Sequence, residues 1–340
     1  MIKNNPQKQS IRIYLILGNA CNLSCKYCMP HKYIVSECEN SRVADKVIKM
    51  IEEQAENCDQ TTVIFYGGEP LLYFNSIKGV VERLGKKVQY ATMTNGKALT
   101  KETVDYFNEN EFEINLSYDG YNTRETRGYD PLQDNLENVL NLDCVWITSC
   151  LTTKAYPLEL CSAFNDFDKV YFERHGYHAR FNIALVTNPN VNNELYKYDY
   201  ERIEKEMAYI NDCFVTQNTK NSGAFLYGTR LASIIHRNVM LPNVPKRISI
   251  DVDSQGNLYM CALRRETKVT DVDNFGIYQK ITKRMGYEER CKNCPVFPLC
   301  VGGCPYIDDV NEQCKLRRAF YMPTIKAMLL EQEDGQYAWF

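Results

Sequence analysis

The stretch Cys21-Asn22-Leu23-Ser24-Cys25-Lys26-Tyr27-Cys28 directly follows an apolar, β-branched run from Ile11 to Leu17. Three thiolates on so short a loop can each bind one iron of a cubic 4Fe-4S cluster. Such a cluster has four irons, and because the loop supplies no fourth Cys, one iron is left open. An open metal position is one where a substrate binds and reacts. The spacing therefore predicts a catalytic iron-sulfur site.

A structural zinc or redox site is the alternative, because closely spaced Cys in an intracellular protein usually bind a metal of some kind. Zinc sites combine pairs of ligands to reach four, and the loop from Cys21 to Cys28 has no such second pair. The loop alone therefore favours iron-sulfur chemistry over zinc.

Composition narrows the class of protein. The chain has 340 residues, 44% of them hydrophobic, enough for the core of one large or two ordinary domains. The net charge of -3 provides no basic surface for nucleic acid. No apolar run reaches the length of a membrane span, and the polar N-terminus lacks a signal core, so we expect a cytoplasmic protein that does not bind membranes.

Strand and helix patterns alternate along the first two thirds of the chain. Alternation of this kind predicts a parallel sheet with right-handed crossovers, either a barrel or a doubly wound sheet. Helical periodicity is expected over the residues 41–56, 101–108, 132–142 and 196–210, and one short helix within 217–244. β-Branched and aromatic runs predict strands at the residues 11–17, 61–66, 88–93, 112–116, 145–151, 181–186 and 248–253.

Gly67-Gly68-Glu69-Pro70 ends the second predicted strand, where glycines allow the backbone to approach a ligand closely. A Gly-Gly pair on its own usually marks only a turn. Together with the C-x3-C-x2-C loop and its aromatic residue before the last Cys, it resembles the radical S-adenosylmethionine (radical SAM) enzymes. The resemblance selects a partial (β/α)6 TIM barrel and implies that Cys21, Cys25 and Cys28 bind a catalytic 4Fe-4S cluster. S-adenosylmethionine would chelate the open iron and yield a 5'-deoxyadenosyl radical.

The same resemblance implies a cosubstrate site. Gly67, Gly68 and Glu69 would hold the amino group of S-adenosylmethionine, and Tyr27 would pack against its adenine. Of Arg124 and Arg127 we favour Arg127 for the carboxylate, although the His-Asp pair usual in the family is replaced by Glu125-Thr126. The remaining residues expected to line the cosubstrate are Thr94, Asn95, Ser117 and Asp119. Asn-Gly and Asp-Gly pairs at these positions also close ordinary turns.

The C-terminal third carries a second group of cysteines. The G-x4-C element from Gly256 to Cys261 precedes Cys291, Cys294, Cys300, Cys304 and Cys314. This pattern resembles the SPASM domain, which carries auxiliary iron-sulfur clusters. The resemblance implies an outer cluster on Cys291, Cys294, Cys300 and Cys314 and an inner cluster on Cys261 and Cys304. The inner set is incomplete. Either His236 or Cys213 completes it, or the inner cluster is missing. A zinc ribbon is the alternative for the whole group of cysteines.

These patterns predict a radical SAM barrel over residues 1–212, a linker over 213–247, and a SPASM-like domain with a C-terminal helix over 248–340. Resemblance to this subfamily implies a maturase that abstracts hydrogen from a ribosomally made peptide and forms a thioether or carbon–carbon cross-link. It would contain one catalytic and one or two auxiliary 4Fe-4S clusters. An electron donor such as flavodoxin or ferredoxin would serve it.

Several alternatives stay open. A peptide epimerase would need a hydrogen donor, for which Cys213 is the candidate. Sulfatase maturases typically carry an Asp after the G-x4-C cysteine, and here Cys261 is followed by Ala262, which counts against that activity. A small-molecule radical SAM enzyme, similar to the molybdenum-cofactor GTP cyclase, is a further candidate. The last alternative is a non-catalytic iron-sulfur scaffold or electron carrier, which would not need Gly67-Gly68-Glu69.

Overall fold

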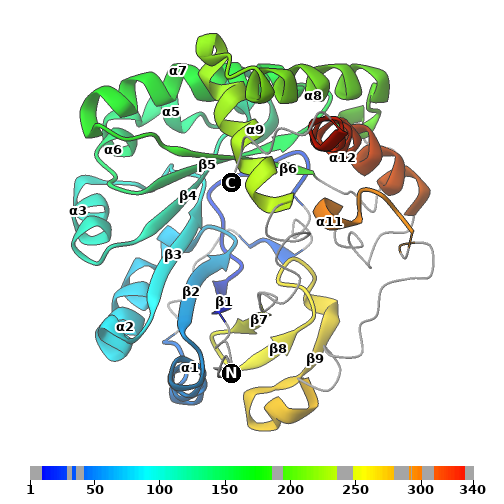
Figure 1. Cartoon of the computed structure of the whole chain (residues 1–340). Helices are drawn as coiled ribbons and strands as arrows, with labels where there is room; N and C mark the ends of the chain where they lie inside the picture. The colour runs from blue at the N-terminus through cyan, green and yellow to red at the C-terminus, as the bar shows by residue number, and fades with distance from the viewer. Residues whose placement is uncertain are drawn as a thin grey trace, which may run out of the picture. The chain divides into compact units, whose positions relative to one another are not determined.

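The computed structural model of the chain describes the residues 10–28, 33–35, 42–185, 194–235, 248–278, 291, 293–300 and 310–333 (Figure 1). The chain divides into two compact units. Unit 1 comprises Met1–Ser117, Arg127–Trp146 and Asn243–Gly286, and unit 2 comprises Tyr118–Thr126, Ile147–Pro242 and Tyr287–Phe340. This division follows packing, and the predicted domain boundaries at residues 212 and 247 stay a prediction.

Unit 1 is built around a sheet in the strand order β4-β3-β2-β1-β7-β8-β9. Strands β1 to β4 and β7 run parallel, and β8 and β9 are antiparallel additions at the edge beyond β7. The strands are β1 (Ser10–Gly18), β2 (Gln60–Gly67), β3 (Gln89–Thr94), β4 (Glu113–Ser117), β7 (Ile248–Asp253), β8 (Asn257–Tyr259) and β9 (Lys268–Asp271). The first four strands are therefore neighbours in chain order, as in a partial barrel.

Figure 1 shows helices α1 (Asp45–Asn57), α2 (Phe74–Leu84) and α3 (Lys101–Glu109) on one side of these strands. The strand residues facing this helical layer are apolar: Leu15 and Phe65 are fully buried. The Phe65 ring stacks on Phe112, which in turn packs against the Phe107 ring of α3. Helices thus cover one face of the sheet, which is what parallel strands linked by crossover helices require.

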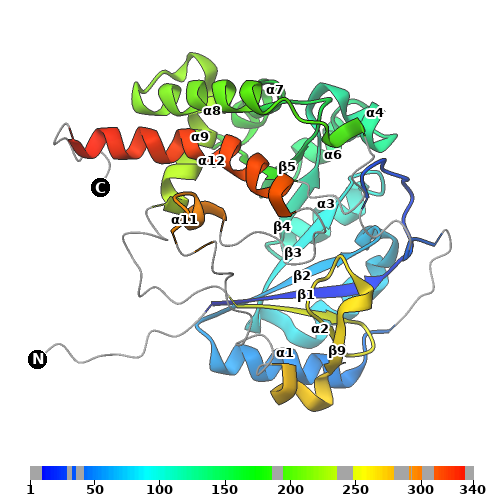
Figure 2. The same cartoon turned by 90° about the vertical axis from the view of Figure 1, so that its right-hand side faces the viewer.

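Unit 2 is mainly helical. The first two residues of strand β5 (Val145–Leu151) belong to unit 1, and the others belong to unit 2. Its neighbour in the sheet there is β6 (Arg180–Leu185). Figure 2 shows the long helices of this unit close together, and α8 packs against both α9 and α12. The helices are α7 (Pro157–His175), α8 (Tyr200–Val215), α9 (Ser222–Ile235), α12 (Val310–Glu333) and the short α11 (Phe297–Cys300). None of the described helices is both long and apolar enough to cross a membrane.

The alternation of strands and helices and the parallel register confirm the predicted α/β class. One predicted helix is wrong in detail, because the residues 132–142 form two short helices, α5 (Pro131–Asp134) and α6 (Leu136–Leu140). They are separated by Asn135, whose Nδ2 donates to the carbonyl oxygens of Gly96 and Leu99 at 3.0 Å each. The predicted short helix within 217–244 is the 14-residue α9. Another short helix, α4 (Thr123–Arg127), follows β4.

Candidate cluster and cosubstrate site

The loop from Cys21 to Cys28 leaves the carboxyl end of β1 and carries three partly exposed thiols, none of which is in a disulfide. Its start is tied down by backbone hydrogen bonds on both sides of Ala20. The Val35 amide donates to the Asn19 carbonyl oxygen at 3.1 Å, and the Cys21 amide donates to the Val35 carbonyl oxygen at 3.3 Å. Inside the loop the Cys28 amide donates to the Cys25 carbonyl oxygen at 3.1 Å, which closes a turn. The loop is thus held at its N-terminal end by hydrogen bonds with Val35.

The chemistry of these donors fits an iron-sulfur cluster. Partial burial raises the pKa of the Cys21 thiol above its ordinary value, and the nearby Glu69 carboxylate and Cys25 thiolate raise it further. Bound iron would favour the thiolate, because coordination removes the proton. The described part of the chain nevertheless holds no group of three His, Cys, Asp or Glu side chains placed to bind a metal ion. Ligation by Cys21, Cys25 and Cys28 therefore stays a prediction.

Gly67 and Gly68 allow the end of β2 to approach the start of the cysteine loop. A Cβ atom on Gly68 would lie 2.2 Å from the Ala20 carbonyl oxygen, and one on Gly67 would lie 2.3 Å from that of Gly18. Gly67 also has a φ of +144°, which L-residues rarely adopt. The Gly68 amide donates to the Gly18 carbonyl oxygen at 3.0 Å. In the structure, these two glycines allow the end of β2 to approach the backbone that leads into Cys21.

Glu69 connects the ends of two strands through a buried carboxylate. Its side chain is 1% exposed, and one oxygen accepts from the Thr94 hydroxyl at 2.7 Å while the other accepts from the Asn95 amide at 2.8 Å. Burial raises the pKa of Glu69, although these hydrogen bonds oppose the rise. Asn95 Nδ2 in turn donates to Asn22 Oδ1 of the cysteine loop at 2.9 Å. The structure thus brings together Glu69, Thr94 and Asn95, as a shared site requires.

Arg127 and Tyr27 contact each other beside the same loop. The Arg127 guanidinium lies 5.2 Å from the centre of the Tyr27 ring, and its side chain is 8% exposed. The Cys25 thiol faces the Arg127 carbonyl oxygen at 4.0 Å. Arg124, the other candidate, is exposed. Arg127 thus lies beside the cysteine loop, and its pairing with the carboxylate of S-adenosylmethionine stays a prediction.

The other two residues expected at the cosubstrate site belong to different units. Ser117 ends β4 in unit 1 and is partly exposed. Asp119 lies in unit 2 and is completely buried. Its carboxylate accepts from the Thr126 hydroxyl at 2.8 Å and from the Cys150 amide at 2.9 Å. Asp119 thus has a structural role within its own unit, and contact with the cosubstrate stays a prediction.

The C-terminal cysteines are divided between the units. Cys261 follows β8 in unit 1, whereas the four cysteines expected to bind the outer cluster belong to unit 2: Cys291, Cys294, Cys300 and Cys314. The Cys294 amide donates to the Cys291 carbonyl oxygen at 3.2 Å, so these two share a turn before α11. Cys304 and His236 lie outside the described residues. This division agrees with separate inner and outer sets, but it does not establish either cluster.

Cys213, the tentative hydrogen donor, lies on α8 and is fully buried. The pKa of the Cys161 thiol on α7 is raised first by burial and then by Glu206 and Cys213. A hydrogen donor must reach a substrate radical. The burial of Cys213 gives this role no support, and the role stays a prediction.

Sequence patterns missed a small group of residues on β1, β2 and β7. The rings of Tyr14 and Tyr66 meet edge to face with centres 6.0 Å apart. Asp251 of β7 accepts a hydrogen bond from the Ala262 amide at 2.7 Å. These residues are far apart in sequence. The signal for them in the sequence was the alternation of apolar and polar side chains along each strand.

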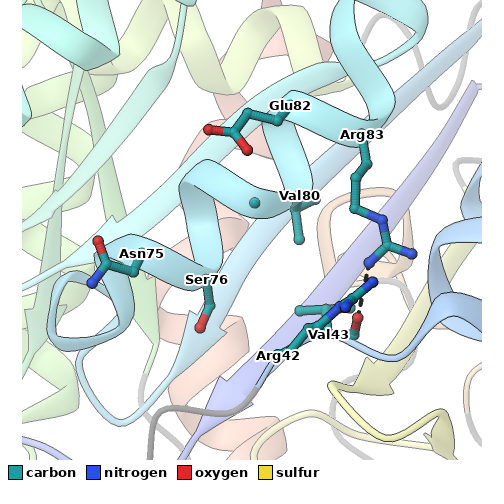
Figure 3. Close-up of a pocket in the computed structure, with 8 residues that line it drawn as sticks. Arg42, Val43, Asn75, Ser76, Val80, Glu82 and Arg83 are labelled. Atoms are coloured by element: carbon teal, nitrogen blue, oxygen red, sulfur yellow. Dashed lines mark hydrogen bonds between the residues drawn. The ribbon is translucent and has the colours of Figure 1, made fainter.

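A surface pocket of about 460 Å³ lies elsewhere in unit 1, between α2 and the segment that precedes α1 (Figure 3). Arg83 points toward the Val43 carbonyl oxygen and donates to it at 3.0 Å, and it also pairs with Asp45 at 2.6 Å. The two arginines of the pocket, Arg42 and Arg83, share this carboxylate. The pocket contains none of the predicted site residues, and we assign it no function.

The radical SAM superfamily model matches residues 15–143, the segment that contains the cysteine loop, Gly67-Gly68-Glu69 and Asn95. These residues form a radical SAM domain. A cysteine-type anaerobic sulfatase-maturating enzyme of Clostridium novyi (strain NT) is 24% identical over 334 residues, which cover 84% of each chain. The alignment therefore continues well beyond the radical SAM domain.

Two groups of solved structures share the fold. Native anSMEcpe with bound AdoMet and the Cp18Cys peptide matches with a TM-score of 0.68 and 18% identity, over 96% of this chain and 99% of that one. Streptococcus suis SuiB bound to the precursor peptide SuiA matches with a TM-score of 0.59 and 16% identity, over 87% and 72%. The chain thus carries a radical SAM domain and shares its fold with anSMEcpe and SuiB. Radical SAM domains use S-adenosylmethionine and a 4Fe-4S cluster.

Proposed function

We propose that this enzyme modifies a ribosomally synthesised peptide by abstracting hydrogen from one of its residues and forming a thioether or carbon–carbon cross-link. The observation that carries the proposal is the fold likeness over nearly the whole chain to two enzymes that were solved with a peptide bound. The cluster, when bound, supplies the electron that cleaves S-adenosylmethionine and releases the abstracting radical. A cluster held by the auxiliary cysteines would receive the electron that the product radical loses.

The residues of this chain would bind and orient the cosubstrate. Cys21, Cys25 and Cys28 would hold the catalytic cluster, leaving one iron for the amino acid part of S-adenosylmethionine. Glu69 keeps the ends of β2 and β3 together through Thr94 and Asn95, and Asn95 reaches the cysteine loop. Arg127, held against Tyr27, would pair with the carboxylate. The strand ends and the loop are therefore coupled before any ligand binds.

Sulfatase maturation is the second candidate, because the Clostridium relative that aligns with most of this chain has that activity in its name. Against it stands Ala262, which occupies the position after Cys261 where we expect an Asp in such enzymes. We further propose that the protein works in the cytoplasm and that a flavodoxin or ferredoxin reduces it. The described cysteines form no disulfide with one another, which suits a reducing compartment.

The test uses protein that is purified and reconstituted with iron and sulfide without oxygen. The wild type and a variant with Cys21, Cys25 and Cys28 changed to Ala are each incubated with S-adenosylmethionine, reductant and any short peptide that a neighbouring gene encodes. Mass spectrometry follows the peptide, and chromatography follows 5'-deoxyadenosine. We expect loss of two hydrogens from the peptide with the wild type only, which identifies a cross-link.

Other outcomes separate the alternatives. Formylglycine in a sulfatase-derived Cys peptide would establish the second candidate. Incorporation of one solvent deuterium without loss of hydrogen would identify an epimerase. A wild type that forms no 5'-deoxyadenosine at all would contradict the proposal and favour an iron-sulfur scaffold or electron carrier.

A further inference from the structure

A row of partly exposed side chains crosses the sheet of unit 1 on the face opposite α1, α2 and α3 (Figure 1). Phe65 points toward these helices, and the register pairs Phe65 with Thr92 and Thr92 with Ile114. All three are at most 1% exposed. Because successive strand residues point to opposite faces, the next residue of each strand points away from the helices. These next residues, each of them partly exposed, are Tyr66, Met93 and Asn115.

Tyr66 joins one end of this row to the segment that carries Cys261. It pairs with Ile16 of β1 and packs against the buried cluster of Ile16, Tyr259 and Ala262. Ala262 directly follows Cys261 in the chain. The row therefore borders the segment that carries one of the cysteines expected to bind an auxiliary cluster.

Asn115 lies toward the other end of the row, inside β4. The Ile114 amide donates to the Cys144 carbonyl oxygen at 2.9 Å, which in a parallel pair of strands places Asn115 beside Trp146 of β5. Ser117, which is expected at the cosubstrate site, lies two residues further along β4 on the same face, about 7 Å away along the strand. Asn115 is therefore one step from the strand end where we expect the cosubstrate.

The amide of Asn115 has an acceptor without a donor. Its Oδ1 atom is buried and accepts no hydrogen bond from the described part of the chain. A buried acceptor that lacks a donor costs free energy, so such an atom in a folded protein needs an explanation. Rotation about χ2, which is broad for Asn, allows either end of the amide to meet a ligand. The other members of the row carry no charge, so a neutral polar ligand fits better than an ion: Tyr66, Met93 and Trp146.

We infer that Asn115 binds a backbone peptide group of the substrate. A carboxamide and a peptide group each offer an N–H donor and a carbonyl acceptor, so the two can form a pair of hydrogen bonds. Oδ1 of Asn115 accepts from the peptide N–H, and Nδ2 donates to a peptide carbonyl oxygen. This inference rests on the proposed function and specifies which residue holds the peptide. A peptide held there lies one step from the expected cosubstrate site, as hydrogen abstraction requires.

The test uses the full-length reconstituted enzyme and the synthetic peptide that the wild type modifies. Asn115→Leu keeps the approximate shape of the side chain and removes both hydrogen-bonding groups. We expect the KM for the peptide to rise about tenfold, the size of a lost hydrogen-bond pair, and the KM for S-adenosylmethionine to stay at its wild-type value. The urea midpoint of unfolding should not fall, because the substitution removes an unpaired buried acceptor.

Asn108→Leu is the matched control. Asn108 is also a partly exposed Asn of unit 1, but its amide donates to the Asn141 carbonyl oxygen at 2.7 Å and accepts from the Asp143 amide at 3.0 Å. We expect this variant to have a lower urea midpoint and an unchanged KM for the peptide. A fall in midpoint as large as this one in Asn115→Leu would show that its amide serves the fold, and would overturn the inference.

Backbone esters identify the group that Asn115 binds. In a set of peptides, each N–H near the modified residue is replaced in turn by an ester oxygen. One ester should raise the wild-type KM about tenfold and that of Asn115→Leu by about twofold or less, because the two changes remove the same hydrogen bond. Asn115→Ala repeats the comparison if the leucine variant fails to fold.

Three results would overturn the inference while the proposed function survives. They are an unchanged peptide KM in Asn115→Leu, a rise in the KM for S-adenosylmethionine instead, and the absence of any ester position that depends on Asn115. A wild type that modifies no peptide would contradict the proposed function itself, and the inference would fall with it.

Discussion

The cysteines near the N-terminus and those near the C-terminus are organised in different ways. The first three lie within eight residues, on one loop that directly follows Ala20, whose carbonyl oxygen accepts from the Glu69 amide at 2.8 Å. The C-terminal cysteines extend over more than fifty residues, with Cys261 in unit 1 and Cys291, Cys294, Cys300 and Cys314 in unit 2. One set is assembled by local spacing, whereas the other depends on how separate segments pack.

This difference implies different weak points. The N-terminal loop depends on backbone geometry at β2, because Gly68 and Glu69 hold its start and its neighbours in place. The C-terminal set depends on its thiols and on α12, which carries Cys314. Four predictions test this contrast.

The largest effect is expected for Gly68→Ala. The added Cβ would lie 2.2 Å from the Ala20 carbonyl oxygen, so the end of β2 must move away from the cysteine loop. We expect destabilisation by about 3 kcal/mol or more and loss of 5'-deoxyadenosine formation. Denaturant unfolding and the cleavage assay measure the two effects.

Gly79→Ala in α2 is the matched control, because a Cβ there meets nothing within 4 Å. It should stabilise the protein by about 0.5–1 kcal/mol and leave cleavage unchanged. Wild-type cleavage by Gly68→Ala would show that the close approach of β2 to the loop is dispensable.

Removing the outer C-terminal thiols is expected to separate metal content from cleavage. Changing Cys291, Cys294, Cys300 and Cys314 to Ser should remove about four iron atoms per chain, while 5'-deoxyadenosine formation without peptide stays within a few-fold of wild type. Changing the three loop cysteines to Ala should also remove about four iron atoms, but abolish cleavage. Zinc in the C-terminal set, or loss of cleavage when only that set is changed, would contradict the contrast.

A smaller effect is expected for Arg127→Lys. The guanidinium lies over Tyr27 and is nearly buried, and lysine cannot provide its planar pair of donors. We expect the KM for S-adenosylmethionine to rise about tenfold, the equivalent of roughly 1.4 kcal/mol. Arg124→Lys, at an exposed position, should leave this KM unchanged. Equal effects of the two substitutions would remove the reason for preferring Arg127.

The smallest effect concerns the pH dependence of stability, where one carboxylate from each region should respond with opposite sign. Burial raises the pKa of Glu69, so the stability that its protonation contributes is present at low pH and lost as pH rises through the folded-state pKa. Hydrogen bonds from Lys315 and Tyr200 lower the pKa of Glu312, so its contribution is present near neutral pH and lost as pH falls.

Urea unfolding between pH 7 and pH 4 measures both contributions. The stability lost in Glu69→Gln should grow on acidification, whereas the stability lost in Glu312→Gln should shrink. Because the Glu312 side chain is 43% exposed, its loss at pH 7 should stay below about 0.5 kcal/mol after screening by solvent. The same sign for both variants would contradict the assigned environments.

The α/β class and the parallel strands β1 to β4 and β7 could be predicted from the sequence alone. Apolar periodicity and ligand spacing involve residues close in the chain, and the backbone geometry of a loop or strand follows from them. The wrong prediction of one helix over 132–142 has a tertiary cause, because Asn135 bonds to the carbonyl oxygens of Gly96 and Leu99 instead of continuing a helix.

The sequence by itself determined that this chain carries three clustered thiols, a glycine-rich strand end and a parallel α/β core. Only the tertiary structure decided that Gly68 packs against Ala20 and that Cys213 is buried. It also decided that the Glu69 carboxylate accepts hydrogen bonds from Thr94 and Asn95. Tertiary packing likewise brings Tyr14 and Tyr66 against Tyr259 and Ala262. These contacts join strands and loops that are distant in sequence. Strand register and side-chain packing determine which of them meet, and no local pattern encodes either one.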